Sequence, residues 1–474
     1  MKLAYLAAIL SLLPLSTIRQ DPPEPYADLK HRAEAHYAQG SFALARDLYH
    51  RAILSDLPPD ERRWVQFRLA DTLWRSRAST ATPDPTDLDA ARLALEELTR
   101  IIPPEPRDLV WAEAHESLGD FSWTRRGAWD WSSAWSHYQS ALSHWSASPD
   151  LELARERYLA IVWKMSAPDT SGGSSEPWRG GYVPQAVLEN AVRLARTPSE
   201  RSRAHFLLAM TLRQRGGDAR SSRRIARAFE AALEGGKELD GYDDALYFYA
   251  QWLAGGGRVV RREGGGWSSE PDFRAALALY RRLAQEFAPG ESRWRDDALR
   301  QAQEIVRPVL GNSASTAFLP GSEIALQLSW RNLARVEIAI YPVELARDLA
   351  LSGDDSSGRL AEHVVLGRRE PYLAFARDTG DAGDHRHGSL ELRLERRLPA
   401  GAYVVEASAA GQRARDLVLV SDAAVLLKAS SGKALAWASD ALSGAPLAGA
   451  ELVLFERSHA RSGWRRRSTG PRSA

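Results

Sequence analysis

The spacing of apolar residues along the chain changes near Pro308 and Gly311. From Pro25 to about Arg307, apolar residues recur with a period near 3.6, and Pro, Gly and Asp separate the segments. Ala, Leu, Arg and Glu, which favour helices, are abundant in this half. Beyond it the period becomes 2, which is typical of half-buried antiparallel strands. The pattern predicts a helical domain over residues 25–307, followed by an all-β part.

Several predicted helices share a short motif: a small residue, an aromatic residue four positions later, and a second small residue three positions after that. Small residues let two helices approach closely, and the aromatic ring fills the space between them. We therefore expect these residues to hold helix pairs together. The motif occurs as Ala45, Tyr49, Ala52 and as Ala134, Tyr138, Ala141, and more loosely as Ile225, Phe229, Ala232 and as Ala276, Tyr280, Leu283.

This motif resembles the tetratricopeptide repeat, a family of 34-residue helix-turn-helix units that bury their apolar faces by stacking. The resemblance implies an all-α helical-repeat solenoid. The units are unevenly spaced, and loops at 76–86, 166–182 and 255–269 separate them. We expect a solenoid with insertions, in which Trp64–Trp74 and Leu88–Leu98 are degenerate members.

The β part is predicted as a series of short strands. Alternation of apolar and polar residues is clearest at Ile324–Trp330, Val336–Ile340 and Leu390–Leu394. Pro-Gly, Ala-Gly, Ser-Gly and Ala-Pro turn signals separate the strands, and this punctuation predicts β-sandwiches. Further strands are expected at Tyr403–Ala407, Leu417–Val420, Ala424–Lys428, Ala434–Ala438 and Glu451–Phe455.

Three stretches of the β part resemble macroglobulin-like domains of bacterial alpha-2-macroglobulins. Phe318–Glu323 resembles the opening turn of the family's first such domain, and Leu398–Glu406 resembles its closing hairpin. Ser443–Leu452 resembles a turn in the next domain, where Gly and Pro set the turn and small residues permit a tight return. The turn residues that carry the resemblance are Pro320, Gly321, Gly401, Tyr403, Gly444, Pro446, Gly449 and Ala450.

The resemblance implies one macroglobulin-like β-sandwich over residues 317–420 and the start of a second, incomplete one over 421–455. It also implies an endopeptidase inhibitor that traps proteases. The chain contains no cysteine, so it has no thioester of the kind many family members carry, and no bait segment can be placed in it. We expect the N-terminal part of such a protein. The alternative is an exported tetratricopeptide-like scaffold for protein–protein interaction, with β-sandwiches as spacers.

The two ends of the chain are predicted to differ from the domains. Residues 1–20 have the layout of a signal peptide or N-terminal anchor: Lys2, the apolar run Leu3–Leu13, then small residues. A buried core helix is the alternative. We expect a bacterial protein of the periplasm or cell envelope, in contact with the membrane only through this segment if it is not cleaved. Residues 456–474 are rich in Arg, Ser and Gly and lack alternation, so we expect a basic disordered tail left by truncation or a frameshift; a natural basic tail is the alternative.

Composition and motifs argue against two classes of function, nucleic-acid binding and catalysis. Lys and Arg total 62 against 61 Asp and Glu, and the net charge of +1 supplies no field to hold nucleic acid. The sequence has no nucleophile elbow, metalloprotease helix, phosphate loop or dinucleotide fingerprint. We therefore expect no enzyme, no cofactor and no metal. The expected partners are proteins: endopeptidases if the family function holds, and other envelope proteins through the helical repeats.

Four features have a functional reading beside a structural one, and we favour the structural one in each case. Arg220–Arg227 is an anion patch or a solvated helix face. Asp384–His387 is a metal cluster or a solvated loop. Gly255–Gly266 is a phosphate cradle or a flexible loop. An aromatic-rich stretch is a stacking surface for sugars or peptides, or helix-pair packing; its residues are Trp123, Trp129, Trp131, Trp135, Tyr138 and Trp145.

Overall fold

The computed structural model forms two compact units, Met1–Arg196 and Thr197–Ala474. The sequence predicted one helical array over 25–307, but the helices are divided between the two units. In a helical-repeat protein each element contacts only its neighbours, so the sequence period does not reveal where one stack ends. The structure describes residues 24–78, 84–100, 107–124, 131–166, 183–214, 218–350, 360–430, 433–458 and 463–469; the predicted signal segment 1–20 lies outside them.

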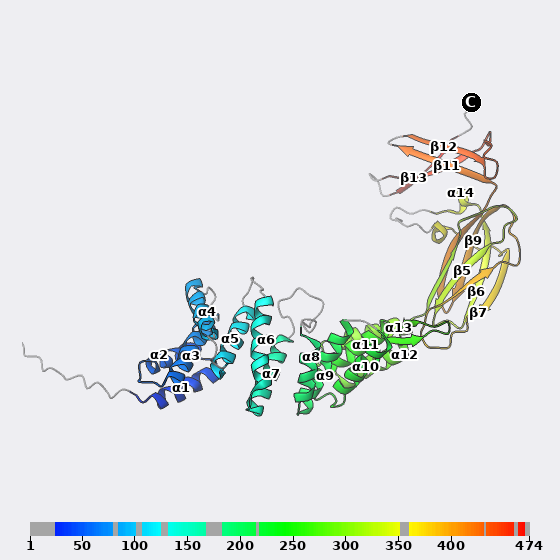
Figure 1. Ribbon diagram of the computed structural model, residues 1–474. Coiled ribbons are helices and arrows are strands. Elements are labelled where there is room, and N and C mark those ends of the chain that lie inside the picture. The colour runs from blue at the N-terminus through cyan, green and yellow to red at the C-terminus, as the bar shows by residue number, and fades with distance from the viewer. Residues whose placement is uncertain are drawn as a thin grey trace, which may run out of the picture. The chain divides into compact units, whose positions relative to one another are not determined.

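The first unit consists of helices that pack in consecutive pairs (Figure 1). Aspartates begin several of these helices, because their carboxylates accept hydrogen bonds from free backbone N–H groups of the first turn. Asp84 accepts from Thr86 N at 2.9 Å and Asp150 from Leu153 N at 3.1 Å. The pairs are α1 (Tyr26–Ala38) with α2 (Phe42–Ala52), α3 (Pro59–Ala78) with α4 (Pro85–Thr99), α5 (Leu109–Thr124) with α6 (Trp131–Ala147), and α7 (Leu151–Met165) with α8 (Gln185–Leu194).

A glycine closes the first helix pair. Gly40 has a φ of +74°, a left-handed conformation that costs glycine little. Its N–H donates to Tyr37 O at 2.9 Å, and Ser41 N donates to His36 O at 2.9 Å. These bonds satisfy the last carbonyls of α1 and turn the chain directly into α2.

The second unit begins with further paired helices. They are α9 (Pro198–Gln214) with α10 (Ala219–Ala232), and α11 (Tyr242–Ala254) with α12 (Phe273–Glu286), followed by α13 (Arg295–Val306). Between α11 and α12 the chain forms a hairpin of β1 (Arg258–Arg261) and β2 (Trp267–Glu270). The sequence predicted a flexible loop there. That prediction is wrong because four-residue strands are too short to produce a period, whereas their backbone groups pair over the whole length.

A β-sandwich follows the helices. One sheet has the strand order β3-β5-β8 and the other β4-β10-β9-β6-β7, and neighbouring strands are antiparallel except β4 with β10. The elements are β3 (Val309–Ala314), β4 (Ala317–Phe318), β5 (Ala325–Arg331), β6 (Arg335–Val343), α14 (Leu345–Asp348), the 3-10 helix η2 (Leu360–His363), β7 (Leu373–Asp378), β8 (Gly388–Arg393), β9 (Gly401–Ala409) and β10 (Gln412–Val420).

The core of the sandwich lies between its two sheets. Alternate residues of β5 and β6 point into it, and Leu328 and Ile338 are 1% and 2% exposed. Leu392 is buried as expected, whereas Leu390, on the edge strand β8, is 40% exposed. β9 is buried on both faces, because a second small apolar cluster that includes Val404 lies on its other side.

Three strands of the sandwich were not predicted. β3 begins at Val309, before residue 317, where the sandwich was expected to start, and β4 and β7 were not expected at all. β3 contains Gly311, Asn312 and Ser313, which have low strand propensity. Its place in the sheet comes from pairing with β5, where a Cβ at Gly311 would lie 2.4 Å from Ser329 Oγ. This contact with a side-chain hydroxyl of the neighbouring strand leaves no trace in the apolar pattern.

The chain after residue 420 forms hairpins. β11 (Ala423–Ser430) pairs with β12 (Lys433–Asp440), and β13 (Leu452–Ser458) pairs with β14 (Gly463–Thr469), each as a separate two-stranded sheet. The described residues of this region form two hairpins and not the two facing sheets of a sandwich. The predicted disordered tail over 456–474 is wrong for β14, because the strand is held by backbone pairing with β13 and its arginine-rich sequence has no period of 2.

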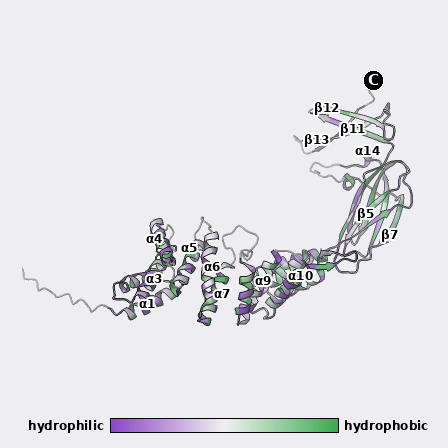
Figure 2. Ribbon diagram, viewed as in Figure 1, coloured by the Kyte–Doolittle hydropathy of each residue, from purple (hydrophilic) through white to green (hydrophobic). Residues whose placement is uncertain are grey.

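Among the described residues, the apolar ones are distributed along the helices and strands, as the hydropathy colouring shows (Figure 2). None of the described helices combines the length and the apolar character that a bilayer crossing requires. The β11–β12 hairpin does expose large apolar side chains: Leu426 is 72% exposed and Trp437 is 53% exposed.

Candidate protein-binding site of the helical units

The small-aromatic-small motif lies on the second helix of each pair that carries it. On α2 and α6 all six motif residues, Ala45, Tyr49, Ala52, Ala134, Tyr138 and Ala141, are 0% exposed. The looser versions put Phe229 of α10 and Tyr280 of α12 at 0% and 2% exposure. α4, expected as a degenerate member, uses the same spacing with Ala91, Leu95 and Leu98, all buried. These residues pack the pairs and present no chemistry to solvent.

The first helices of the pairs in the first unit carry a chain of paired charges, which we call the polar ladder. The ladder consists of Glu34 on α1, Arg68, Asp71 and Arg75 on α3, Asp120 on α5 and Lys164 on α7. Two contacts join residues 34 positions apart: Arg68 Nη2 lies 2.8 Å from Glu34 Oε2, and Tyr37 Oη donates to Asp71 Oδ2 at 2.6 Å. This is the repeat length of the tetratricopeptide family. The recurrence of polar residues at this spacing is a sequence signal that the small-aromatic-small motif did not include.

The ladder continues through α5 to α7. Arg75 contacts Asp71 at 2.9 Å and Asp120 at 2.8 Å, and Lys164 Nζ lies 2.5 Å from Asp120 Oδ1. Tyr138 Oη donates to the same Asp120 oxygen at 2.8 Å, which ties the buried motif ring to the ladder. With three carboxylates and three cations, the ladder is neutral. It therefore fixes the stacking of the first helices and leaves no net charge for a ligand.

The local environment sets the protonation of two carboxyls on α5. Burial acts to raise the pKa of Asp120, but Lys164 and Arg75 outweigh it, so its pKa is lowered. Burial raises the pKa of Glu116 to about 7, although Arg157 and a hydrogen bond from Trp145 Nε1 at 2.6 Å act in the opposite direction. One turn apart on a helix, Asp120 stays ionised while Glu116 takes up a proton near neutral pH.

Glu116 makes the stability of the first unit depend on pH. The folded protein retains its proton up to about pH 7, whereas the unfolded carboxyl releases it near 4.5. Its contribution is complete below pH 4.5 and disappears as the pH rises through 7, so about 2 kcal/mol should be lost between pH 5 and pH 8. Substituting Glu116→Gln, which keeps an acceptor for Trp145, should flatten this part of the profile, measured as the unfolding midpoint against pH. An unchanged slope in the variant would contradict the assignment.

Gly119 provides the space in which Tyr138 packs. A Cβ at Gly119 would lie 2.6 Å from Tyr138 Cε1 and 2.7 Å from Cδ1. Alanine is normally favoured over glycine within a helix by about 1 kcal/mol. Here overpacking costs about 1–3 kcal/mol, so we expect Gly119→Ala to lower the midpoint of thermal unfolding. A higher midpoint would mean that the ring moves freely and that the contact is not tight.

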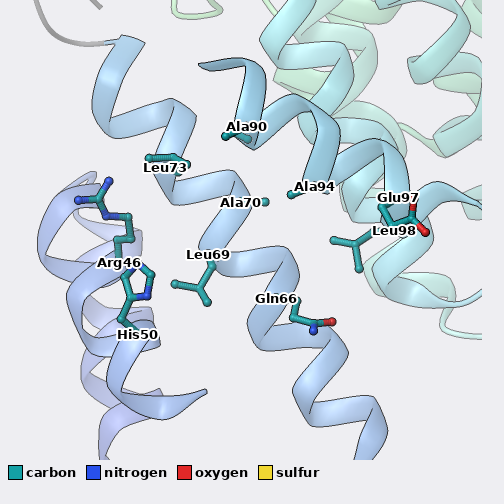
Figure 3. A pocket seen from close by; sticks show the side chains of 11 residues that line it. Arg46, His50, Gln66, Leu69, Ala70, Leu73, Ala90, Ala94, Glu97 and Leu98 are labelled. Atoms are coloured by element: carbon teal, nitrogen blue, oxygen red, sulfur yellow. The ribbon is translucent and has the colours of Figure 1, made fainter. Parts of the chain in front are cut away.

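A groove lined by apolar and polar side chains lies between α2, α3 and α4 (Figure 3). Its volume is about 400 Å³. The floor is formed mainly by Leu69, Ala70 and Leu73 of α3, and Arg46 and His50 of α2 line one side. None of these residues was predicted from the sequence as part of a site, because the groove exists only where three helices meet.

No family model and no curated protein matches this chain. Similar solved structures include a fragment of Escherichia coli alpha-2-macroglobulin spanning domains MG0-NIE-MG1, at 16% identity over 35% of this chain and 58% of that fragment, with a TM-score of 0.21. A shorter fragment, spanning NIE-MG1, has 16% identity over 35% of this chain and 84% of its own length, with a TM-score of 0.21.

A bacterial S-layer protein is also among the similar structures. The N-terminal part of SbsC has 11% identity over 91% of this chain and 90% of its own, with a TM-score of 0.18. Of the macroglobulin fragment spanning MG0-NIE-MG1, this chain covers 58% of the length. At these TM-scores the likenesses give no support for a particular site or activity.

The turn residues of the predicted macroglobulin-like domains lie at turns or strand ends. Gly321, Gly444 and Gly449 have φ values of +81°, +72° and +76°. Gly401 begins β9, and Tyr403 is buried with its hydroxyl donating to Pro399 O at 2.9 Å. The remaining residues of this set are Pro320, which precedes Gly321 in its turn, Pro446, which bridges to Ser439, and Ala450, which is exposed. These turn residues do not come together at one site.

The Asp384–His387 loop lies between β7 and β8 of the sandwich and contacts the helical part of the second unit. His385 Nδ1 lies 2.7 Å from Asn332 Oδ1, and Arg386 lies 3.0 Å from Glu270. Asn332 also donates to the carbonyls of Ile305 and Arg307 at the end of α13. Within the described ranges no three His, Cys, Asp or Glu side chains gather as a metal site would require. The contacts of His385 and Arg386 give the loop a structural role that the solvated-loop interpretation did not include.

The other two candidate features have structural roles. Tyr138 and Trp145 are buried between helices, and Trp123 and Trp135 are half-buried, which agrees with helix-pair packing. Trp129 lies outside the described residues, as does the side chain of Trp131. The arginines at 220, 223, 224 and 227 are exposed on α10, as expected for a solvated face.

Proposed function

We propose that this chain is a non-catalytic scaffold of the bacterial cell envelope: its helical units bind a partner protein, and its β-sandwich is a macroglobulin-like module. The observation that carries the proposal is the polar ladder. A neutral, internally paired ladder holds α1, α3, α5 and α7 together and keeps the helix pairs in fixed positions. Stacked helix pairs of this kind present extended surfaces on which other proteins bind.

The test compares the whole chain with a chain lacking residues 1–196, which removes the first unit. Both are incubated with envelope extract from the source bacterium, and retained proteins are quantified by mass spectrometry. We expect at least one protein to be retained only by the whole chain and to bind it directly after purification. The proposal fails if both chains retain the same proteins, or if the purified candidate does not bind.

A second candidate is the inhibition of endopeptidases, which the resemblance at Phe318–Glu323 and Leu398–Glu406 implies. Without cysteine this chain forms no thioester, so we propose that it contributes the entry scaffold of a protease trap. A trap protects large protein substrates while small peptides are still cleaved. We expect the chain alone to leave both cleavage rates of broad-specificity endopeptidases unchanged. Selective protection of the large substrate would instead favour a complete inhibitor.

A further inference from the structure

The groove between α2, α3 and α4 combines an apolar floor with polar side chains along its two edges. Figure 3 shows Arg46 and His50 on one side of the α3 residues Leu69 and Leu73, with Ala94 and Leu98 of α4 on the other. Leu69 and Leu73 are only half-buried although they lie in the middle of α3. The groove is therefore apolar surface that the first unit leaves uncovered.

Small side chains keep this groove open. α4 faces it with Ala90, Ala91 and Ala94, so the space between α4 and α2 above α3 is not filled by side chains. The floor runs from Gln66 to Leu73, which is two helical turns, or about 10 Å. A two-turn apolar strip fits a short amphipathic helix whose apolar residues are spaced i, i+4 and i+7.

The charges along the groove are asymmetric. Arg46 Nε is enclosed and has no hydrogen-bond partner. Neither Arg46 nor His50 takes part in an ion pair or side-chain hydrogen bond among the described residues. On the opposite edge Glu97 is paired with Arg100. The two terminal guanidinium nitrogens of Arg46 are not enclosed, so a carboxylate lying in the groove can pair with them and give this cation its counter-charge. The α2 side therefore favours a carboxylate, and the α4 side disfavours a second one.

We propose that this groove binds a short amphipathic helix of a partner protein, with apolar side chains on Leu69 and Leu73 and an Asp or Glu directed at Arg46 and His50. The inference rests on the proposed function and identifies where in the first unit, and by what chemistry, a partner is held. The site lies over the α2, α3 and α4 side chains of Figure 3, apart from the neutral polar ladder.

The test uses the whole chain and three fluorescent peptides constrained to be helical. One has Leu at i, i+4 and i+7 flanked by Glu, one has Lys in place of Glu, and one has the first composition in scrambled order. We expect the acidic peptide to bind at least ten-fold more tightly than the other two in fluorescence anisotropy. Equal binding of all three would overturn the inference.

Variants of the chain test whether the peptide binds in the groove. Arg46→Glu should weaken the acidic peptide at least ten-fold and strengthen the Lys peptide, whereas Arg51→Glu, outside the groove on the same helix, should change neither by more than two-fold. Ala94→Trp should fill the groove and abolish binding, whereas the neighbouring Leu93→Trp should not. Circular dichroism confirms that each variant is folded. Equal effects of a variant and its control would place the peptide elsewhere and overturn the inference.

The same variants separate this inference from the function on which it rests. If the partner captured through the first unit still binds the Ala94→Trp chain, the scaffold function stands and the groove is not its site. If Ala94→Trp instead changes the sedimentation of the chain alone, the groove is occupied by a second copy, and the partner-helix inference is wrong.

Discussion

Replacing Asp120 with alanine is expected to destabilise the first unit by about 3–5 kcal/mol, because it removes one partner of a buried ion-pair network. Asp120 is 6% exposed and accepts hydrogen bonds from three directions: Arg75 of α3 at 2.8 Å, Tyr138 of α6 at 2.8 Å and Lys164 of α7 at 2.5 Å. Arg75 retains Asp71 in the variant. Lys164 loses the one ion pair recorded for it in the described residues. A half-buried ammonium group without a counter-charge and an unpaired tyrosine hydroxyl remain.

Hydrogen–deuterium exchange measures this effect where it occurs. In the variant the amides of α3, α5 and α7 should exchange more than about 100-fold faster, because their protection follows the free energy of opening. Asp120→Asn, which keeps the shape and loses the charge, should lie between the wild type and the alanine variant. Asp89→Asn, at an exposed acid of α4, is the matched control and should change stability by less than about 0.5 kcal/mol. A change below about 1 kcal/mol for Asp120→Ala would mean that the ladder does not hold the stack.

Truncating Phe229 to alanine should destabilise the helices of the second unit by about 3–5 kcal/mol. Phe229 is 0% exposed on α10, and its ring centroid lies 6.4 Å from that of Phe206 on α9. It also stacks on Tyr249 of α11 at 5.0 Å. The ring therefore joins three helices, and alanine would leave a cavity that rigid neighbours close only in part.

The helices in which amide exchange accelerates show whether the aromatic position of the motif packs the helix pair. Exchange should accelerate in α9, α10 and α11, while the amides around Tyr49 in the first unit should be unchanged, since the two units are separate. Phe229→Leu should cost less, because it preserves most of the buried volume, and Arg227→Ala on the exposed face of α10 should be nearly neutral. Comparable losses for Phe229→Ala and Arg227→Ala would show that the aromatic position of the motif does not pack the helices.

Only part of the candidate site could be predicted from the sequence. The motif identified the rings that pack the helix pairs, since four-residue and three-residue spacings place side chains on one helical face. The ladder was missed because its members are ordinary charged residues; Glu34 and Arg68 become informative only when their 34-residue separation is noticed. The groove was also missed, since nothing local distinguishes Arg46 from any other solvated arginine.

The sequence by itself determined where the helices and the regularly alternating strands form, because periods of 3.6 and 2 record which side of each element meets the core. That is why the helical half, the alternation of β5 and β6 and the packing positions of Tyr49 and Phe229 could be read in advance. The tertiary structure decided what depends on backbone pairing and on contacts between distant segments. It decided that Gly311 lies in a strand, that an arginine-rich segment forms β14, and that the helices divide into two units. It also decided which charges are used internally and which remain free, because the pairing of Asp120 and the isolation of Arg46 are set by the helices packed around them.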